Sequence, residues 1–213
     1  FKVESDGKSA QVVIMGIIGN HHIYPALSAI AVGLSQGLNV DKMAKTLRNH
    51  DTPLGRMKLI KGIKNSIIID DTYNSSPVAL EEALRTLQTI EGARRKIAVL
   101  GDMLELGSYS VSSHKEAGAI VSRSCHLLVA VGTRARGIAE GALQNGMREK
   151  DVLQFDSSEE AGSYLQNLIS EKDVILVKGS QSVRMEKVVE EIMANPEEKE
   201  HLLVRQEKEW EER

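Results

Sequence analysis

The sequence lacks the features that mark secreted, disulfide-bonded and membrane-spanning proteins. Its only cysteine is Cys125, so no disulfide can form within the chain, and a reducing compartment such as the cytoplasm is expected. The apolar runs, at residues 12–18 and 27–34 for example, are far shorter than the ~20 residues that a membrane helix needs. A basic start followed by an apolar stretch, which would mark a signal peptide, is also missing.

Strong charge bias and metal-binding patterns are missing as well. The formal net charge is -3, which gives no electrostatic reason to expect nucleic acid or an anionic membrane as a partner. His21 and His22 are adjacent, and the sequence has no His-Glu-x-x-His motif and no cysteine pair, so no metal site is predicted. The chain begins at Phe1 and not at methionine, and we therefore expect a processed or truncated chain.

A complete phosphate-binding loop is also absent. Gly7-Lys8-Ser9 matches the end of such a loop, but Lys2 stands where its first glycine would have to be. Because no buried strand precedes the tripeptide and no helix follows it, we interpret it as part of a hairpin turn.

Residues 1–54 are predicted to form a hairpin and two helices. Residues 1–15 carry strand formers on either side of a turn, and residues 23–36 carry apolar side chains at helical spacing. Asp41 is expected to cap the second helix, which must stop before Pro53.

Between residues 55 and 195, continuous apolar runs alternate with amphipathic helical patterns. Continuous runs indicate strands buried on both faces, and the alternation indicates βαβ units. We therefore expect an α/β, Rossmann-like, doubly wound and mostly parallel sheet. Residues 196–213 are charge-dense and are predicted to form a surface helix or a partly ordered tail. The strands are predicted at 67–69, 97–100, 127–131, 152–155 and 174–177, and the helices at 77–90, 113–124, 134–145, 158–169 and 182–193.

Two strand exits carry candidate site residues, because ligands of doubly wound sheets bind beyond the carboxyl ends of the strands. Asp70-Asp71 places two carboxylates side by side, and their repulsion favours a cation, a hydroxyl donor such as a ribose, or full solvation. Lys178-Gly179-Ser180 offers a cation and a hydroxyl at the predicted start of a helix, which favours a carboxylate or a phosphate. A capped helix with a solvated charge explains either pattern equally well.

Five segments match one known family when they are taken together. They are GNHHIYPALSAIAVG at 19–33, TPLGRM at 52–57, IIIDDTYNSSP at 67–77, VLGDMLELG at 99–107 and VKGSQSVRME at 177–186. Together they resemble the Mur ligase family, in particular the branch that uses D-alanyl-D-alanine. The first segment resembles the helix that closes the family's central ATPase domain, and the second resembles the linker to its C-terminal domain. The other three resemble strand exits of that C-terminal domain.

The resemblance implies three regions and one activity. Residues 1–54 would be a remnant of the central ATPase domain, residues 55–195 the C-terminal domain, and residues 196–213 a charged tail. The activity would be ATP-dependent addition of D-alanyl-D-alanine to UDP-N-acetylmuramoyl-tripeptide in peptidoglycan synthesis, through an acyl phosphate. ATP and Mg²⁺ would be the cofactors, and most Mg²⁺ ligands would come from the rest of the central domain. Without that domain and the N-terminal domain, we expect the chain to be inactive.

The resemblance also implies which residues meet the nucleotide. Arg56 would be the catalytic residue and would reach the ATP phosphates, where a planar guanidinium stabilises developing charge. Asp71 would accept hydrogen bonds from the ribose, and Tyr73, Asn74 and His21 would complete the ATP site.

The dipeptide site is implied at two other strand exits. Lys178 and Ser180 would hold the dipeptide carboxylate, and His114 matches a recurrent family histidine of structural or functional role. The residues expected to line the pocket are Asp102, Met103, Leu104 and Glu105.

The chain departs from the family pattern at three positions. His22 and Pro25 replace two asparagines that help to hold adenine, and Gln181 replaces an arginine, which removes a cation beside the expected anion site. Two other hypotheses remain: a non-catalytic Rossmann-like module that binds a nucleotide or peptide, and a degenerate homologue whose charged tail docks a partner.

Overall fold

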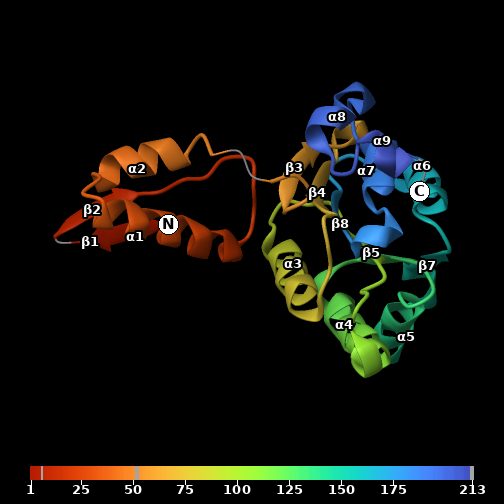
Figure 1. The fold of residues 1–213 in the computed structure, drawn as a ribbon. Helices are drawn as coiled ribbons and strands as arrows, with labels where there is room; N and C mark the ends of the chain where they lie inside the picture. The colour runs from red at the N-terminus through yellow and green to blue at the C-terminus, as the bar shows by residue number, and fades with distance from the viewer. Residues whose placement is uncertain (6, 51–52, 212–213) are drawn as a thin grey trace. The chain divides into compact units, whose positions relative to one another are not determined.

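The computed structural model describes residues 1–5, 7–50 and 53–211, which form two compact units (Figure 1). Unit 1 is Phe1–Pro53 and unit 2 is Leu54–Arg213. In unit 1, strands β1 (Lys2–Ser5) and β2 (Lys8–Gln11) pair in antiparallel fashion, and helices α1 (Ile23–Ser35) and α2 (Val40–Leu47) follow. The predicted hairpin and helices are confirmed.

A small apolar cluster holds unit 1 together. It joins Val3 and Ala10 of the hairpin to Ile30 of α1 and Ala44 of α2. The expected cap of α2 is wrong by two residues. The side chain of Asn39, and not that of Asp41, accepts the first helical N–H groups, with Oδ1 2.8 Å from the backbone nitrogen of Asp41.

Unit 2 is built on a six-stranded sheet that is parallel except at one edge. The strand order is β3-β4-β8-β5-β6-β7, and only β3 runs antiparallel to its neighbour. The predicted doubly wound, mostly parallel α/β class is therefore confirmed. The strands are β3 (Lys58–Lys61), β4 (Ile67–Asp71), β5 (Lys96–Gly101), β6 (Leu127–Val131), β7 (Val152–Phe155) and β8 (Val174–Lys178).

Helices cover both faces of this sheet (Figure 1). Ile97 and Val99 of β5 pack in one core cluster with Leu165 and Val188, while the intervening Ala98 is also fully buried. Continuous apolar strands are thus buried on both faces, as the sequence predicted. One face carries α3 (Pro77–Thr89), α4 (Ser110–Ser124) and α5 (Arg136–Gln144), and the other carries α6 (Ser158–Leu168) and α7 (Glu186–Ile192).

The last predicted helix begins later than the sequence indicated. A short 3-10 turn, Gln181–Val183, follows β8, and Arg184 then adopts a left-handed backbone with φ 56. Because a left-handed residue interrupts a right-handed helix, α7 starts only at Glu186. Ser180 therefore precedes a short turn and does not open an α-helix, which corrects the expected anion site at a helix N-terminus.

The C-terminal residues are more firmly packed than a charged tail would be. Short helices α8 (Lys199–Leu202) and α9 (Lys208–Glu211) flank an irregular stretch, residues 203–207. In that stretch Leu203 and Val204 are 1% and 8% exposed, and Leu203 belongs to the core cluster of α6 and α7. The charge-dense composition concealed these apolar anchors.

Strand β3 was not predicted from the sequence. β3 has the sequence KLIK, in which only Ile60 is buried, so its apolar signal was too short to be recognised.

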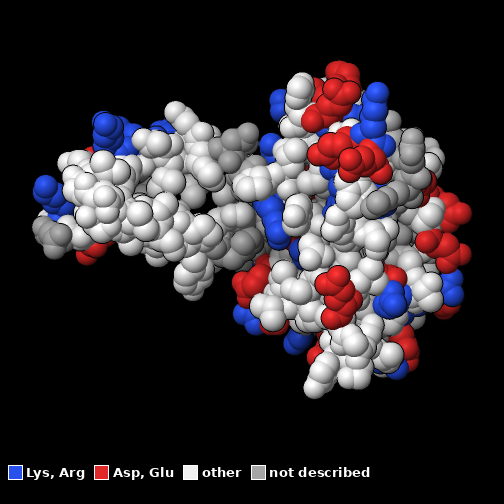
Figure 2. Space-filling model, viewed as in Figure 1, with Lys and Arg blue, Asp and Glu red and all other residues white. Residues whose placement is uncertain are grey.

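Both signs of charge are interspersed on the viewed face of unit 2 (Figure 2). Within the described ranges, no helix has the length and apolar character required to cross a bilayer.

Candidate functional site

A pocket of about 720 Å³ lies at the carboxyl edge of the sheet in unit 2. It is where the loops after β4, β5 and β8 meet the C-terminal segment, the position that ligands occupy in doubly wound folds. Its lining residues are Asn74, Ser75 and Ser76 after β4, Leu104, Glu105 and Leu106 after β5, Ser180, Gln181, Ser182 and Arg184 after β8, and Trp210.

Hydrogen bonds between the loops fix the floor of this pocket. The hydroxyl of Ser180 accepts a hydrogen bond from the backbone nitrogen of Leu104 at 2.9 Å, and the backbone nitrogen of Ser180 donates to the carbonyl of Asp102, also at 2.9 Å. The loops after β5 and β8 are therefore held together by two bonds centred on one serine. Ser180 thus positions the pocket as well as lining it.

Asp102 and Met103 lie outside the pocket lining and hold the loop after β5 in place. The Oδ1 atom of Asp102 accepts from the backbone nitrogen of Ala135 at 2.7 Å, which ties the loop after β6 to the loop after β5. Met103 is fully buried, and neither residue is part of the pocket lining. The expectation that Asp102 and Met103 line the pocket is corrected, because their side chains serve contacts inside the protein.

His114 holds the same loop from α4. Its Nε2 atom lies 3.0 Å from the backbone nitrogen of Met103, and its Nδ1 atom lies 2.6 Å from the carbonyl of Ser110. A backbone N–H can only donate, so Nε2 accepts and Nδ1 carries the proton. This neutral, buried imidazole positions the loop after β5.

Asp71 and Lys178 form a buried ion pair at neighbouring strand ends. The Nζ atom of Lys178 lies 2.6 Å from Oδ2 of Asp71 and 2.9 Å from the carbonyl of Asn74. The two side chains are 9% and 1% exposed, so Lys178 cannot present its charge to a ligand in this arrangement. The structure thus pairs Asp71 and Lys178 with each other, and their expected roles at a ribose and at a carboxylate stay predictions.

Arg56 lies on the exposed ring of Tyr73, with its guanidinium carbon 4.2 Å from the ring centroid. Gly55 makes this contact possible, because its φ of +66 is rarely adopted by other residues and a Cβ there would lie 2.8 Å from the backbone nitrogen of Tyr73. Residues 55 and 56 therefore bring a cation and an aromatic ring together at the end of β4.

Asp70 is a fully buried carboxyl with one oxygen satisfied. Its Oδ1 atom accepts hydrogen bonds from the backbone nitrogen and the hydroxyl of Thr72, at 3.2 and 2.6 Å. Its Oδ2 atom has no hydrogen-bond partner in the described part of the chain. Burial raises the pKa of Asp70 to about 6, against the lowering effect of the Thr72 hydrogen bonds, and the carboxylates of Asp71 and Glu186 raise it further.

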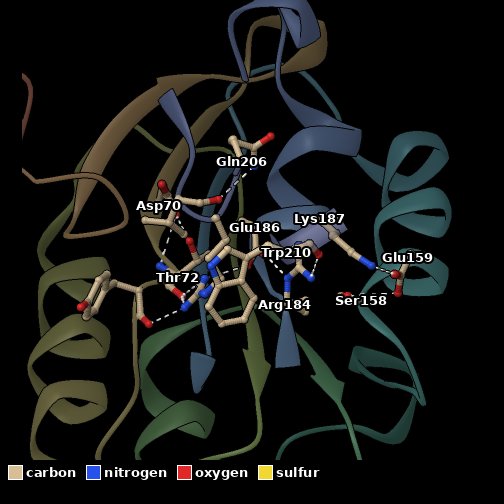
Figure 3. Close-up of polar contacts among 12 residues, drawn as sticks. Asp70, Thr72, Ser158, Glu159, Arg184, Glu186, Lys187, Gln206 and Trp210 are labelled. Carbon is tan, nitrogen blue, oxygen red and sulfur yellow. Dashed lines mark hydrogen bonds and ion pairs between the residues drawn. The ribbon is translucent and has the colours of Figure 1, made fainter. Parts of the chain in front are cut away.

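A second ion network joins the C-terminal segment to the pocket (Figure 3). The buried carboxylate of Glu186 accepts from Nε of Arg184 at 2.5 Å and from Nη1 of Arg205 at 2.9 Å. Arg205 also donates to the carbonyls of Thr72 and Tyr73, at 3.2 and 2.5 Å. Burial lowers the pKa of Arg205, while the charge of Glu186 opposes that change. The end of the chain is thereby bound to the exit of β4.

The structure brings together only part of the predicted site. Asn74, Leu104, Glu105 and Ser180 line the pocket as one group. Of the nucleotide residues, Arg56 and Tyr73 meet on the surface of unit 2, whereas the side chain of His21 lies outside the described part of the structure.

Arg184 and Trp210 line the pocket but were not predicted from the sequence. Arg184 stands within the segment VKGSQSVRME, inside the helix predicted at 182–193, and that pattern gives no sign that its side chain faces the pocket. Trp210 lies in the charge-dense C-terminal region, where nothing in the local sequence signals a pocket wall.

The described residues fit a nucleotide in part and a metal poorly. Arg56 and Tyr73 expose a cation and a ring, whereas the carboxylate of Asp71 is bound by Lys178. In the part of the chain that the structure describes, no cluster of three or more histidine, cysteine, aspartate or glutamate residues has metal-binding geometry.

Comparison with known proteins identifies related sequences. The Mur ligase, glutamate ligase domain family matches residues 55–181. The UDP-N-acetylmuramoyl-tripeptide--D-alanyl-D-alanine ligase of Bacillus subtilis (strain 168) is 33% identical over 181 residues, which cover 84% of this chain and 39% of that protein. The enzyme of the same name from Escherichia coli (strain K12) is 32% identical, over 86% of this chain and 39% of that protein.

Solved structures give the same result for the fold. Crystal structure II of MurF from Acinetobacter baumannii superposes with a TM-score of 0.77 at 28% identity, over 89% of this chain and 41% of that one. MurF ligase from Thermotoga maritima in complex with ADP superposes with a TM-score of 0.73 at 25% identity, over 89% and 42% of the two chains. This chain thus spans well under half the length of the relatives that it matches.

The raised pKa of Asp70 predicts a pH-dependent contribution to stability. The folded protein holds a proton on Asp70 between pH 3.8 and about 6, where the unfolded chain has released it. This contribution to the free energy of unfolding is complete below pH 3.8 and is lost as the pH rises through about 6. Relative to Asp70→Asn, we expect the wild type to lose roughly 3 kcal/mol between pH 4 and 7.

Urea unfolding at a series of pH values measures this difference. Asp156→Asn is the matched control, because Asp156 lies directly after β7 and is exposed, whereas Asp70 is buried near the end of β4. A constant difference between the wild type and Asp70→Asn across pH 4–7 would show that Asp70 titrates normally.

The buried pair predicts a strong dependence of stability on both partners. Replacing Lys178 with methionine leaves the carboxylate of Asp71 buried without its cation, and we expect a loss of about 3–5 kcal/mol in the free energy of unfolding. Adding Asp71→Asn to Lys178→Met removes the orphaned charge and should recover roughly half of that loss.

Lys187→Met is the control for this experiment. Lys187 bonds to Glu159 near the surface (Figure 3), with side chains 32% and 54% exposed, and such pairs contribute little. Equal losses for Lys178→Met and Lys187→Met in urea unfolding would contradict the interpretation of a tightly buried pair.

Proposed function

The chain belongs to the Mur ligase family, and on that basis we propose that it is the C-terminal part of a longer ATP-dependent peptide ligase. The proposed reaction adds D-alanyl-D-alanine to UDP-N-acetylmuramoyl-tripeptide in peptidoglycan synthesis. The curated relatives that carry this name match most of the chain but less than half of their own length. ATP supplies the phosphoryl group that activates the acceptor carboxylate, and the described residues would bind and orient the incoming dipeptide.

The charge of the pocket is the observation that carries this proposal. Glu105 and Arg184 place one carboxylate and one guanidinium in a single lining, beside the apolar side chains of Leu104, Leu106 and Trp210. A dipeptide of alanine has the complementary features, namely an ammonium group, a carboxylate and two methyl groups. Its ends lie ~7 Å apart when it is extended, which a pocket of about 720 Å³ accommodates.

Glu105 is the proposed partner of the dipeptide ammonium group. It is exposed at the pocket and has a left-handed backbone with φ 62, a conformation that costs a non-glycine residue energy and often occurs at functional sites. The bonds of Ser180 to the neighbouring loop keep Glu105 in place. Holding the amine in one orientation prepares it to attack an activated carboxylate.

The nucleotide is proposed to approach the exit of β4, where Arg56 and Tyr73 are exposed. A guanidinium stacked on an aromatic ring is held in place yet keeps its hydrogen-bond donors, so Arg56 can meet phosphate oxygens. Mg²⁺ is proposed to be held by other parts of the ligase.

Dipeptide binding tests the proposal directly. Calorimetry of the 213-residue chain with D-alanyl-D-alanine should show saturable binding. Because Glu105→Gln removes the proposed partner of the ammonium group, we expect about tenfold weaker binding. Glu149→Gln, at an exposed site outside the pocket, should bind as the wild type does. No heat of binding for the wild type, or an unchanged affinity for Glu105→Gln, would argue against the dipeptide site.

We also expect these 213 residues to be inactive in isolation. The sequence has no complete phosphate-binding loop to hold ATP, so the chain incubated with ATP, Mg²⁺ and both substrates should release no phosphate above a sample without protein. Measurable turnover of ATP coupled to peptide-bond formation would refute this expectation.

A further inference from the structure

Arg184 is the cation that the structure places in the pocket. Lys178, which the sequence offered as the anion-binding residue, donates to Asp71 and to the carbonyl of Asn74 behind the pocket. Arg184 lines the pocket, and its side chain lies next to Trp210 in Figure 3.

The backbone and the side chain of Arg184 are both held in place. Its backbone is left-handed, with φ 56, between the 3-10 turn and α7. Nε donates to the buried carboxylate of Glu186 at 2.5 Å, and Nη1 donates to the carbonyl of Trp210 at 2.5 Å. The indole ring of Trp210 lies 5.4 Å from the guanidinium carbon. A side chain with so little freedom loses little entropy when it binds a ligand.

This arrangement leaves hydrogen-bond capacity on the guanidinium. Nε and Nη1 make the two bonds described above, and no bond from Nη2 occurs within the described ranges. The side chain of Arg184 is 11% exposed, so its remaining donors are largely removed from bulk water. Donors in such surroundings bind a carboxylate more strongly than donors on the open surface do.

We propose that Arg184 is the carboxylate-binding residue of the pocket and that the C-terminal segment, residues 203–210, holds it in position through Trp210. The ligand class is a small molecule with a free terminal carboxylate next to a small apolar group. The identity of that ligand as D-alanyl-D-alanine rests on the proposed function, whereas the carboxylate site rests on the pocket geometry alone.

The hydroxyl groups of the pocket support the same assignment. Ser75, Ser76 and Ser182 line it together with Arg184, so a bound carboxylate can accept from hydroxyls as well as from the guanidinium. Arg205 anchors the segment through Glu186 and the carbonyl of Thr72, and it therefore acts as a positioning residue for Trp210.

The single tryptophan provides a direct probe of the site. In ¹⁵N-labelled protein, the indole N–H of Trp210 gives one resolved NMR cross-peak. N-acetyl-D-alanine and N-acetyl-D-alanine amide differ only in a carboxylate against a carboxamide, so comparing them isolates the carboxylate contact. We expect the acid to shift the indole peak saturably, and the amide to bind about tenfold more weakly.

Substitutions of Arg184 identify the cation responsible. Arg184→Gln should abolish the preference for the acid, and Arg184→Lys, which keeps the charge but not the fork of donors, should retain part of it. Arg136→Gln is the matched control, because Arg136 is paired with the exposed Asp156 outside the pocket and should keep the full preference. Far-UV circular dichroism checks that each variant is folded. If Arg184→Gln does not fold, the outcome is decided by Arg184→Lys and by the comparison of acid with amide in the wild type.

The outcomes separate this proposal from the proposed function. Equal binding of acid and amide by the wild type, or an unchanged preference in folded Arg184→Gln, overturns the carboxylate site, even where D-alanyl-D-alanine binds. A preference that depends on Arg184, without binding of D-alanyl-D-alanine, supports the carboxylate site and refutes the dipeptide as its ligand. Absence of any response to acid, amide and dipeptide overturns both.

Discussion

The buried ion pair between Lys178 and Asp71 is the constraint on which the carboxyl edge of the sheet depends. The two residues are register partners at the ends of the parallel neighbours β8 and β4, and a charge buried at either position requires the other. Both strands must therefore end at the same level. Lys178 also donates to the carbonyl of Asn74, and Ser180 two residues later bonds to the loop after β5. The pocket floor follows from these contacts without help from a ligand.

The carboxylate of Glu186 plays the corresponding part for the C-terminal segment. It accepts from Arg184 and Arg205, so one buried anion orients two guanidinium groups. Arg205 uses its other donors on the carbonyls of Thr72 and Tyr73, which a chain leaving a sheet edge would otherwise expose to water. The exit of β4 and the end of the chain thus satisfy each other's polar groups, and a segment with the composition of a loose tail becomes part of the site.

The sequence predicted what depends on local pattern and not what depends on distant partners. Continuous apolar runs identified five of the six strands of unit 2, and the rule for doubly wound sheets identified the correct edge. The pairing of Lys178 with Asp71 was not predicted, because the two residues lie 107 residues apart and only the strand register brings them together. Arg184 and Trp210 were missed for the same reason, because a left-handed turn and a contact across 26 residues have no periodic signature.

The cation of the pocket illustrates why position in the fold matters more than position in a motif. The family pattern places an arginine where this chain has Gln181, and by sequence alone that change removes a positive charge beside the expected anion site. Gln181 and Arg184 line the same pocket, however, because the 3-10 turn and the left-handed residue after β8 return the chain to it. A carboxylate in the pocket still meets a guanidinium, held by Glu186 from within the protein. The substitution at Gln181 therefore gives no argument against a binding site, since the turn that follows it supplies the charge.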